Sequence, residues 1–351
     1  MPRVRNLKRK LLVSLGTLVV ALVIGELVTR ALEPGPFSLF DHNPYHMLDE
    51  AGLVARHDPG FEGRWDGTWY ATNSLGMRGR ELPPDGGGPR FTVACLGDSC
   101  TFGKGVVEAD CWPRQLERLL TARAGGAWTP VVANLGVNGY SGATYLRMLR
   151  DLGDDVGPDV VVVGYNLNDF PNAIRAVNEK VFEDRQARRL IPVGTRDFLG
   201  RFALYRFARQ TFYHLNRDRD WARAEAFAQG AGELAPDVRA EQRGYLEALR
   251  NEARARDAEL LVFLFPYESQ VYLDSFDDGP IRQLADICAE LEVPFFDVAS
   301  EFRERARATD PPGRLFLRGD RYHPNATGYA IVAARVLAAL DEQEWLPGGG
   351  G

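Results

Sequence analysis

The feature that most constrains the fold is an alternation of short apolar runs with helical patterns, which begins at Phe91 and continues almost to the C-terminus. The apolar runs are rich in β-branched side chains, as is typical of strands that are buried on both faces. We expect strands at residues 91–96, 130–135, 159–165, 259–265 and 294–298, and helices at residues 112–122, 143–152, 237–256, 280–291 and 325–340. The alternation predicts a three-layer α/β/α sandwich with a mainly parallel sheet.

Residues 1–30 combine a basic start with an apolar run. Five of the first ten residues are Arg or Lys, and residues 11–28 are then apolar apart from Ser14, Thr17 and Glu26. A run of about eighteen residues is just long enough to cross a bilayer. We interpret residues 1–30 as a cytoplasmic basic segment and an uncleaved transmembrane helix, with a cleaved signal peptide as the alternative. The basic flank predicts a cytoplasmic N-terminus and an extracytoplasmic body, which would be periplasmic in a Gram-negative cell.

Composition divides the rest of the chain. Residues 31–89 are rich in Gly, Pro and aromatic side chains and predict a wrap and a linker, with a turn at residues 73–79. The α/β domain is expected at residues 90–345, followed by an unstructured tail at residues 346–351. Residues 186–236 interrupt the alternation with aromatic side chains set between arginines. We expect an insertion packed on the core there, with a lid or a membrane-interface segment as the alternative.

Charge and cysteine content narrow the class of protein. A net charge of −6 argues against a nucleic-acid partner. Four cysteines at irregular spacing are too few for a disulfide scaffold or a zinc site. Cys95 and Cys288 fall on apolar faces, whereas Cys100 and Cys111 flank one turn, where an extracytoplasmic location would permit a bridge.

The first predicted strand ends in Gly97-Asp98-Ser99, where α/β folds place their ligands. A phosphate-binding loop is one interpretation, but its spacing is wrong: five residues separate Gly97 from Gly103, where a P-loop has four. Lys104 is also followed by glycine rather than by Ser or Thr. The other interpretation makes Ser99 a nucleophile, which requires a base and donors for an oxyanion.

Candidates for these partners follow other elements of the predicted fold. Of the five histidines, only His323 lies on a loop between predicted α/β elements, and Asp320 precedes it by three residues. That spacing can turn the carboxylate toward one imidazole nitrogen and leave the other nitrogen for the serine. Gly136 follows the second strand and could offer a backbone N–H, and Asn168 follows the third and could offer a side-chain amide. Either alone would be ordinary turn chemistry.

These four segments, in this order, resemble the four blocks of the SGNH (GDSL) hydrolase superfamily. The similar stretches are Gly97-Asp98-Ser99 to Gly103, then Gly136, then Asn168-Asp169, and finally the segment from Asp320 to Pro324. The resemblance spans about residues 90 to 340, and the N-terminal anchor and the turn at residues 73–79 are similar to those of a membrane-tethered bacterial subgroup. One departure is Asn166, which stands where the third block usually has glycine and puts the local loop shape in question.

The resemblance implies a flavodoxin-like fold and acyl-ester chemistry without a metal or organic cofactor. Ser99 would attack the ester, His323 would take its proton, and Asp320 would orient His323. The Ser99 N–H, the Gly136 N–H and the Asn168 amide would hold the oxyanion. We expect an esterase that cleaves O-acyl esters, with acetyl as the expected acyl group, on envelope glycans or lipids. Two alternatives stay open: an O-acetyltransferase on an envelope polysaccharide, which would need a partner to supply the acyl donor, and a non-catalytic anchored binding module.

Overall fold

The computed structural model describes residues 2–32, 45–47, 55–65, 68–84, 86–169, 199, 202, 204–205, 208, 236–272, 278–308, 313–317, 320 and 322–348. The chain forms two compact units. The first consists of Met1–Asp41 and Val177–Ala224, and the second of His42–Ala176 and Glu225–Gly351.

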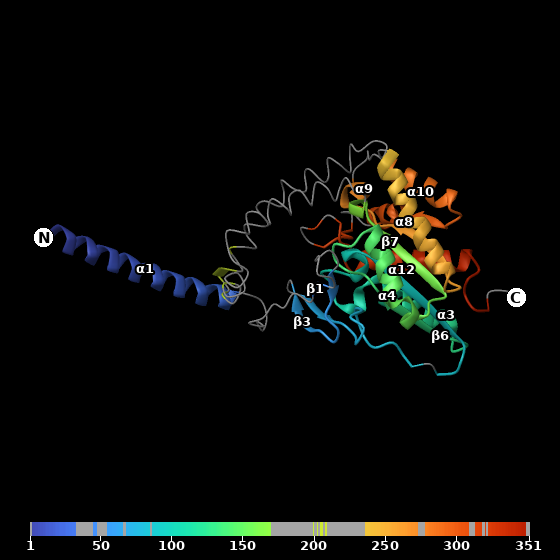
Figure 1. The fold of residues 1–351 in the computed structure, drawn as a ribbon, viewed down its shortest axis with the longest axis horizontal. Coiled ribbons are helices and arrows are strands. Elements are labelled where there is room, and N and C mark those ends of the chain that lie inside the picture. Colours follow the sequence, from blue (N-terminus) through green and yellow to red (C-terminus); the bar gives the residue numbers. More distant parts are fainter. Residues whose placement is uncertain are drawn as a thin grey trace. The chain divides into compact units, whose positions relative to one another are not determined.

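A five-stranded parallel sheet forms the centre of the second unit (Figure 1). Its strands are β5 (Arg90–Gly97), β6 (Thr129–Asn134), β7 (Val160–Tyr165), β8 (Glu259–Leu264) and β9 (Phe295–Asp297). Their order is β6-β5-β7-β8-β9, so the direction of winding reverses between β5 and β7. In doubly wound sheets the ligand crevice lies at the carboxyl ends of the strands at this reversal. All five predicted strands are confirmed, each to within one residue at either end.

Helices cover both faces of the sheet (Figure 1). One face packs against α4 (Gly142–Val156), α8 (Pro236–Arg254) and α10 (Gly279–Glu290), and the other against α3 (Trp112–Ala124), α11 (Ala299–Arg307) and α12 (Ala326–Glu342). Within β5, Ala94 and Leu96 face the first layer, whereas Val93 and Cys95 face the second. A strand that is buried on both sides needs apolar side chains at every position, which explains the unbroken apolar runs.

The five predicted helices are present, and the structure adds shorter ones that the periodicity does not reveal. These are α2 (Ser99–Phe102), α9 (Glu268–Tyr272), α11, and the 3₁₀ turns η1 (Glu108–Asp110) and η2 (Leu167–Asp169). Apart from α11, which has nine residues, these elements have three to five residues and cover about one turn, too little for an apolar stripe to repeat. The core also reaches beyond the predicted domain end, because Leu346, assigned to the tail, is buried against the α3 and α12 layer.

Two small antiparallel hairpins precede the sheet in the second unit. They pair β1 (Tyr45–Met47) with β2 (Ala55–His57), and β3 (Glu62–Trp65) with β4 (Thr68–Ala71). The chain then makes the predicted turn, in which Gly76 N donates to Asn73 O at 2.9 Å. Beyond the turn, Arg78 forms a bridge to Asn134 at the end of the edge strand β6. The segment that follows the two hairpins therefore contacts the sheet at the carboxyl end of β6.

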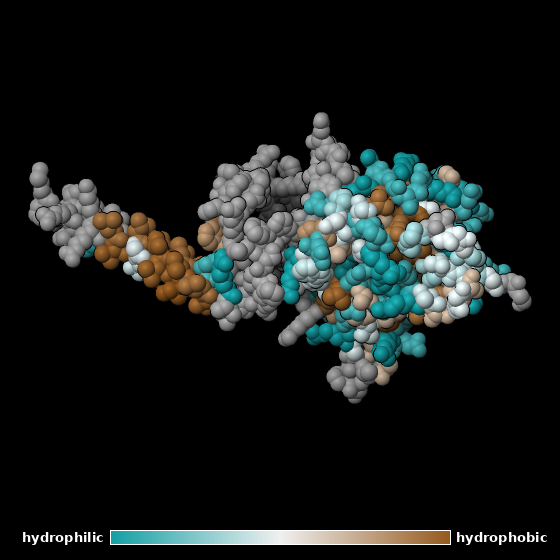
Figure 2. Space-filling model, turned by 90° about the horizontal axis from the view of Figure 1, so that it is seen from below, coloured by the Kyte–Doolittle hydropathy of each residue, from teal (hydrophilic) through white to brown (hydrophobic). Residues whose placement is uncertain are grey.

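In the first unit, α1 (Pro2–Leu32) carries one stretch, Leu12–Arg30, that is long and apolar enough to cross a membrane. Its side chains form the brown surface of the helix in Figure 2. A signal sequence would have the same length and composition. Near the end of this stretch, the Glu26 carboxylate accepts hydrogen bonds from Arg30 Nε at 2.6 Å and from Leu204 N at 2.9 Å. Most of the predicted insertion at residues 186–236 lies outside the described residues. Its two interpretations, a segment packed on the core and a lid or membrane-interface segment, therefore stay predictions.

Candidate active site

Ser99 is the first residue of α2, the single helical turn that follows β5. Asp98 caps this turn, because its Oδ1 accepts a hydrogen bond from Cys100 N at 2.8 Å. Gly103 closes the turn in the left-handed region, with a φ of 81°. The first N–H groups of a helix have no partner within it, so the Ser99 N–H is placed to donate elsewhere. The Ser99 side chain is thereby held at the carboxyl end of β5, beside the reversal of the sheet.

His323 lies on the loop before α12, far from Ser99 in sequence but in contact with it. Asn325 caps α12 by accepting hydrogen bonds from Thr327 N and Gly328 N. Backbone pairing fixes the loop on its other side, since Leu317 N donates to His323 O at 3.0 Å. His323 Nε2 is 2.8 Å from Ser99 Oγ, within hydrogen-bonding distance.

Asp320 occupies the other side of the imidazole. Its Oδ2 is 2.7 Å from His323 Nδ1, and its Oδ1 accepts from the backbone N atoms of Tyr322 and His323, each at 3.1 Å. Burial alone would raise the pKa of Asp320, but the hydrogen bond and charge of His323 and these two N–H groups outweigh it and hold the pKa at about 2. The structure therefore brings Ser99, His323 and Asp320 into one hydrogen-bonded chain, with the acid ionised over the physiological range.

Cys100 is adjacent to Ser99 and is fully buried. Its Sγ accepts a hydrogen bond from Asn166 Nδ2 at 3.2 Å. Burial raises the pKa of the thiol well above its usual value, and the carboxylates of Asp98 and Asp320 raise it further. The protonated thiol is a poor nucleophile. Cys100 and Cys111 are both free, so the bridge considered from the sequence is absent.

Gly136 lies beside the nucleophile turn, but its N–H is engaged. It donates to Asn134 Oδ1 at 3.0 Å. The N–H that the sequence predicts as an oxyanion donor is thus already hydrogen-bonded within the protein in this structure. The glycine has a packing role instead, because a Cβ there would lie 2.3 Å from Phe102 N. Three residues later, Gly139 is exposed, has a φ of 78°, and has open space where a Cβ would lie.

Asn168 belongs to η2, directly after β7, and its side chain lies outside the described part of the structure. Its neighbour Asp169 is buried and accepts from Asn166 N at 2.8 Å and from the Tyr145 hydroxyl at 2.9 Å. Burial, and then the nearby charge of Asp98, raise the pKa of Asp169 well above its usual value. These contacts fix the loop that carries Asn168. A buried tyrosine on a helix has the pattern of a core residue, so this contact of Tyr145 is not predictable from the sequence.

The sequence model described as the GDSL-like lipase/acylhydrolase family matches residues 95–331, a segment that contains Ser99, Asp320 and His323. The chain belongs to this family. It is thus a GDSL-type serine hydrolase, and the predicted membership and α/β fold are confirmed. No curated protein matches the chain.

Solved structures to which this chain is similar include two that are named as esterases. The acetyl xylan esterase AlAXEase is 16% identical, with a TM-score of 0.44, and the match covers 71% of this chain and 100% of that one. TesA is 15% identical, with a TM-score of 0.43 and coverage of 73% and 99%. The psychrotrophic esterase EstA from Pseudoalteromonas sp. is 12% identical, with a TM-score of 0.41 and coverage of 72% and 97%.

Proposed function

We propose that this chain is a membrane-tethered serine esterase that uses Ser99 as nucleophile, His323 as general base and Asp320 as the group that orients the base. The observation that carries the proposal is the continuous chain of contacts from Asp320 Oδ2 to His323 Nδ1 at 2.7 Å and from His323 Nε2 to Ser99 Oγ at 2.8 Å. A serine becomes nucleophilic when a neutral imidazole can take its proton. The ionised carboxylate keeps Nδ1 protonated, so that Nε2 is the free base.

In the proposed reaction, Ser99 Oγ forms a bond to the acyl carbon as its proton passes to His323 Nε2. The proton then moves to the leaving alkoxide as the ester C–O bond breaks, which yields an acyl-enzyme and a free alcohol. Water attacks the acyl-enzyme by the same route and restores Ser99. Asp320 stabilises the imidazolium that forms in each half of the reaction.

We assign the oxyanion of each tetrahedral intermediate to three donors. The first is the Ser99 N–H, which begins α2. The second is the Asn168 side-chain amide, on the loop that Asp169 fixes to Tyr145. The third is the Gly139 N–H, in place of Gly136, because Gly139 is exposed and its backbone is open to a ligand. Donors that are already oriented cost little reorganisation when the charge develops.

The proposed substrates are O-acyl esters, with acetyl as the acyl group, of envelope glycans or lipids. The support is positional: the basic start and the apolar stretch of α1 fit an uncleaved anchor with its N-terminus in the cytoplasm. Such an anchor holds the catalytic unit at the outer surface of a membrane, where these esters occur. Mass spectrometry of protein from the membrane fraction tests the anchor. An intact Met1 segment supports it, and a chain that starts after α1 contradicts it.

The esterase proposal is tested by hydrolysis of 4-nitrophenyl acetate and of an acetylated glycan. Ser99→Ala is expected to remove both activities. Cys100→Ala, next to the nucleophile, and Ser300→Ala, on the surface of α11, are expected to retain them. Equal loss of activity in Cys100→Ala and Ser99→Ala, with both folded, would contradict the assignment of the nucleophile. Acetyl transfer to an added glycan in place of free acetate would identify a transferase.

A further inference from the structure

Arg78 lies outside the part of the chain that matches the family, yet it contacts the nucleophile turn. The turn before it sets its position. Asn73 Oδ1 accepts from Leu75 N and from Met77 N, each at 3.0 Å. Gly76 is required there because its φ is 76° and a Cβ would lie 2.6 Å from His57 O. The backbone of Arg78 is then fixed to the sheet, as its N donates to Asn134 O at 3.2 Å.

The guanidinium of Arg78 is buried, and the residue is only 5% exposed. It donates hydrogen bonds to three backbone carbonyls, those of Phe102, Gly103 and Val106. It also lies over two aromatic rings, 4.7 Å from the centre of Tyr70 and 4.8 Å from that of Phe102. A planar cation with several donors suits such a site, whereas an ammonium group could not reach all three carbonyls at once.

Two of these carbonyls, at Phe102 and Gly103, end the helical turn that begins at Ser99. A single turn is not stable by itself, and its last carbonyls have no partners within it. Side chains from outside supply them here. Besides Arg78, Asn134 Nδ2 donates to Thr101 O at 3.1 Å. Gly103 leaves room for the cation, because a Cβ there would lie 2.8 Å from Arg78 Nη1.

From these contacts we propose that Arg78 is a positioning residue for Ser99, an inference that rests on the proposed function. Arg78 holds the C-terminal end of α2, and α2 carries Ser99 at its other end. The 2.8 Å contact between Ser99 Oγ and His323 Nε2 depends on where this turn lies. The segment before the sheet, which contains Arg78, thereby helps to position the nucleophile and is more than a linker.

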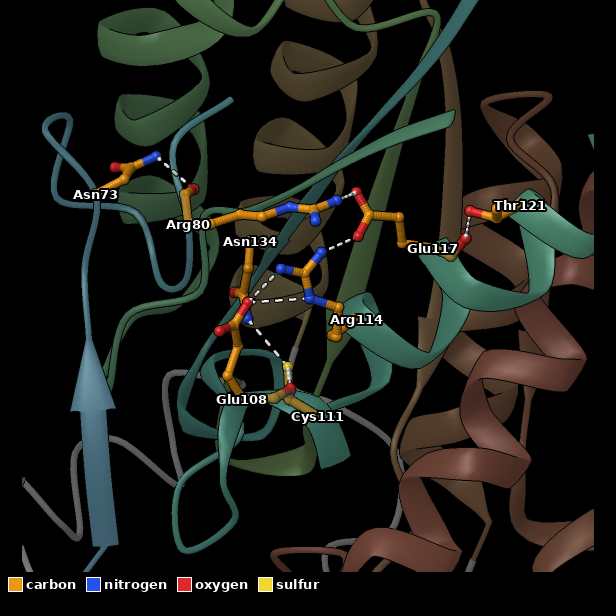
Figure 3. Close-up of polar contacts among 8 residues, drawn as sticks. All are labelled: Asn73, Arg80, Glu108, Cys111, Arg114, Glu117, Thr121 and Asn134. Atoms are coloured by element: carbon orange, nitrogen blue, oxygen red, sulfur yellow. Dashed lines mark hydrogen bonds and ion pairs between the residues drawn. The ribbon is translucent and has the colours of Figure 1, made fainter. Parts of the chain in front are cut away.

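The neighbouring Arg80 provides a matched control. It comes from the same segment, but its side chain is 64% exposed and pairs with Glu117 at 3.1 Å, away from α2. Figure 3 shows Arg80 and Arg114 directed at the same Glu117 carboxylate. Glu117 therefore keeps a partner in Arg80→Gln, which is expected to fold and to retain the kcat of the wild type.

The test compares Arg78→Lys and Arg78→Ala with Arg80→Gln in the full-length protein. A misplacement of about 1 Å at a reacting group can cost on the order of 10²-fold in rate, so we expect kcat of both Arg78 variants to fall by about tenfold to hundredfold. KM for a short ester should change by less than about twofold, because Arg78 does not reach the substrate. Labelling by a fluorophosphonate should slow by the same factor as kcat. Added guanidinium ion should partly restore Arg78→Ala, and sodium ion at equal ionic strength should not.

The outcomes separate this inference from the proposed function. If the wild type reacts with the probe and folded Arg78→Lys reacts at the same rate, Arg78 does not position Ser99 and the inference is overturned. A rise in KM with unchanged kcat would overturn it too, since that pattern indicates substrate binding. If the folded wild type does not react at all, the proposed function fails first. Thermal unfolding shows which variants are folded at the assay temperature. If Arg78→Ala is unfolded, the test relies on Arg78→Lys, which keeps the charge and most of the aliphatic side chain.

Discussion

The replacement Asp320→Asn tests how the acid acts on His323. The carboxylate has two separate tasks: Oδ1 accepts two backbone N–H groups of its own loop, and Oδ2 accepts from His323 Nδ1. An asparagine can keep its oxygen on the loop, but its NH₂ group then faces Nδ1. Two donors cannot bond to each other, so the imidazole is expected to place its proton on Nε2 instead. In that tautomer Nε2 of His323 carries a proton and has no lone pair with which to accept the Ser99 proton.

The expected loss in kcat is on the order of 10⁴, the size seen when the same change is made in a serine protease triad. That loss corresponds to about 5 kcal/mol of transition-state stabilisation. The free energy of unfolding at neutral pH should fall by less than this, because the loop keeps its acceptor. In Asp320→Ala both loop N–H groups lose theirs, at a cost of about 1–3 kcal/mol for an unsatisfied buried donor.

The dependence of the free energy of unfolding on acid pH provides a second test of the Asp320 carboxylate. Its pKa falls from 3.8 to about 2 on folding, so the ionised group stabilises the native state above about pH 4, and this contribution is lost as the pH falls toward 2. A shift of this size corresponds to on the order of 2 kcal/mol. The free energy of unfolding of the wild type should therefore drop more steeply between pH 4 and about 2 than that of Asp320→Asn.

The assays are kcat with 4-nitrophenyl acetate and urea unfolding at several pH values. The surface variant Ser300→Ala serves as the control for both. A loss of less than about tenfold in kcat for a folded Asp320→Asn would refute the reasoning, because the carboxylate would then not set the tautomer. Parallel unfolding curves in acid would show that Asp320 does not have the lowered pKa.

Three further substitutions test separate parts of the account. Gly136→Ala should reduce both stability and kcat, because its Cβ would lie 2.3 Å from Phe102 N; a fully active, equally stable variant would contradict the close packing. Asn168→Ala should lower kcat by about 10²–10³, and a loss below tenfold would remove Asn168 from the oxyanion hole. Asn325→Ala should cost about 1 kcal/mol in urea unfolding, since its side chain accepts from Thr327 N and Gly328 N; an unchanged midpoint would contradict that capping role.

Much of the fold could be predicted because its signal is local and repeated. Strands such as β5 and β7 are apolar at most positions, since helices cover both faces of the sheet. The boundaries followed directly from where these runs begin and end. The short helix α2 gave no such signal, because its four residues are held by contacts from distant segments rather than by their own periodicity.

Some residues of the site could likewise be predicted from the sequence, and others could not. Ser99 and His323 were predictable because each lies beside a glycine, proline or aspartate that marks a loop at the end of an element. The role of Gly136 was not predictable. It depends on Asn134, whose side chain turns back to accept the Gly136 N–H, and nothing in the spacing shows that. Arg78 was missed for a similar reason: a single arginine in a turn resembles a solvated surface residue until the fold buries it.

The most direct test of the central claim is to locate the adduct that a fluorophosphonate forms with the full-length protein. Peptide mass spectrometry of the wild type should find the phosphonyl group on Ser99, and Ser99→Ala and His323→Ala should remain unlabelled. A folded wild type that never reacts, or an adduct on another residue such as Cys100, would contradict the assignment of Ser99 as the nucleophile.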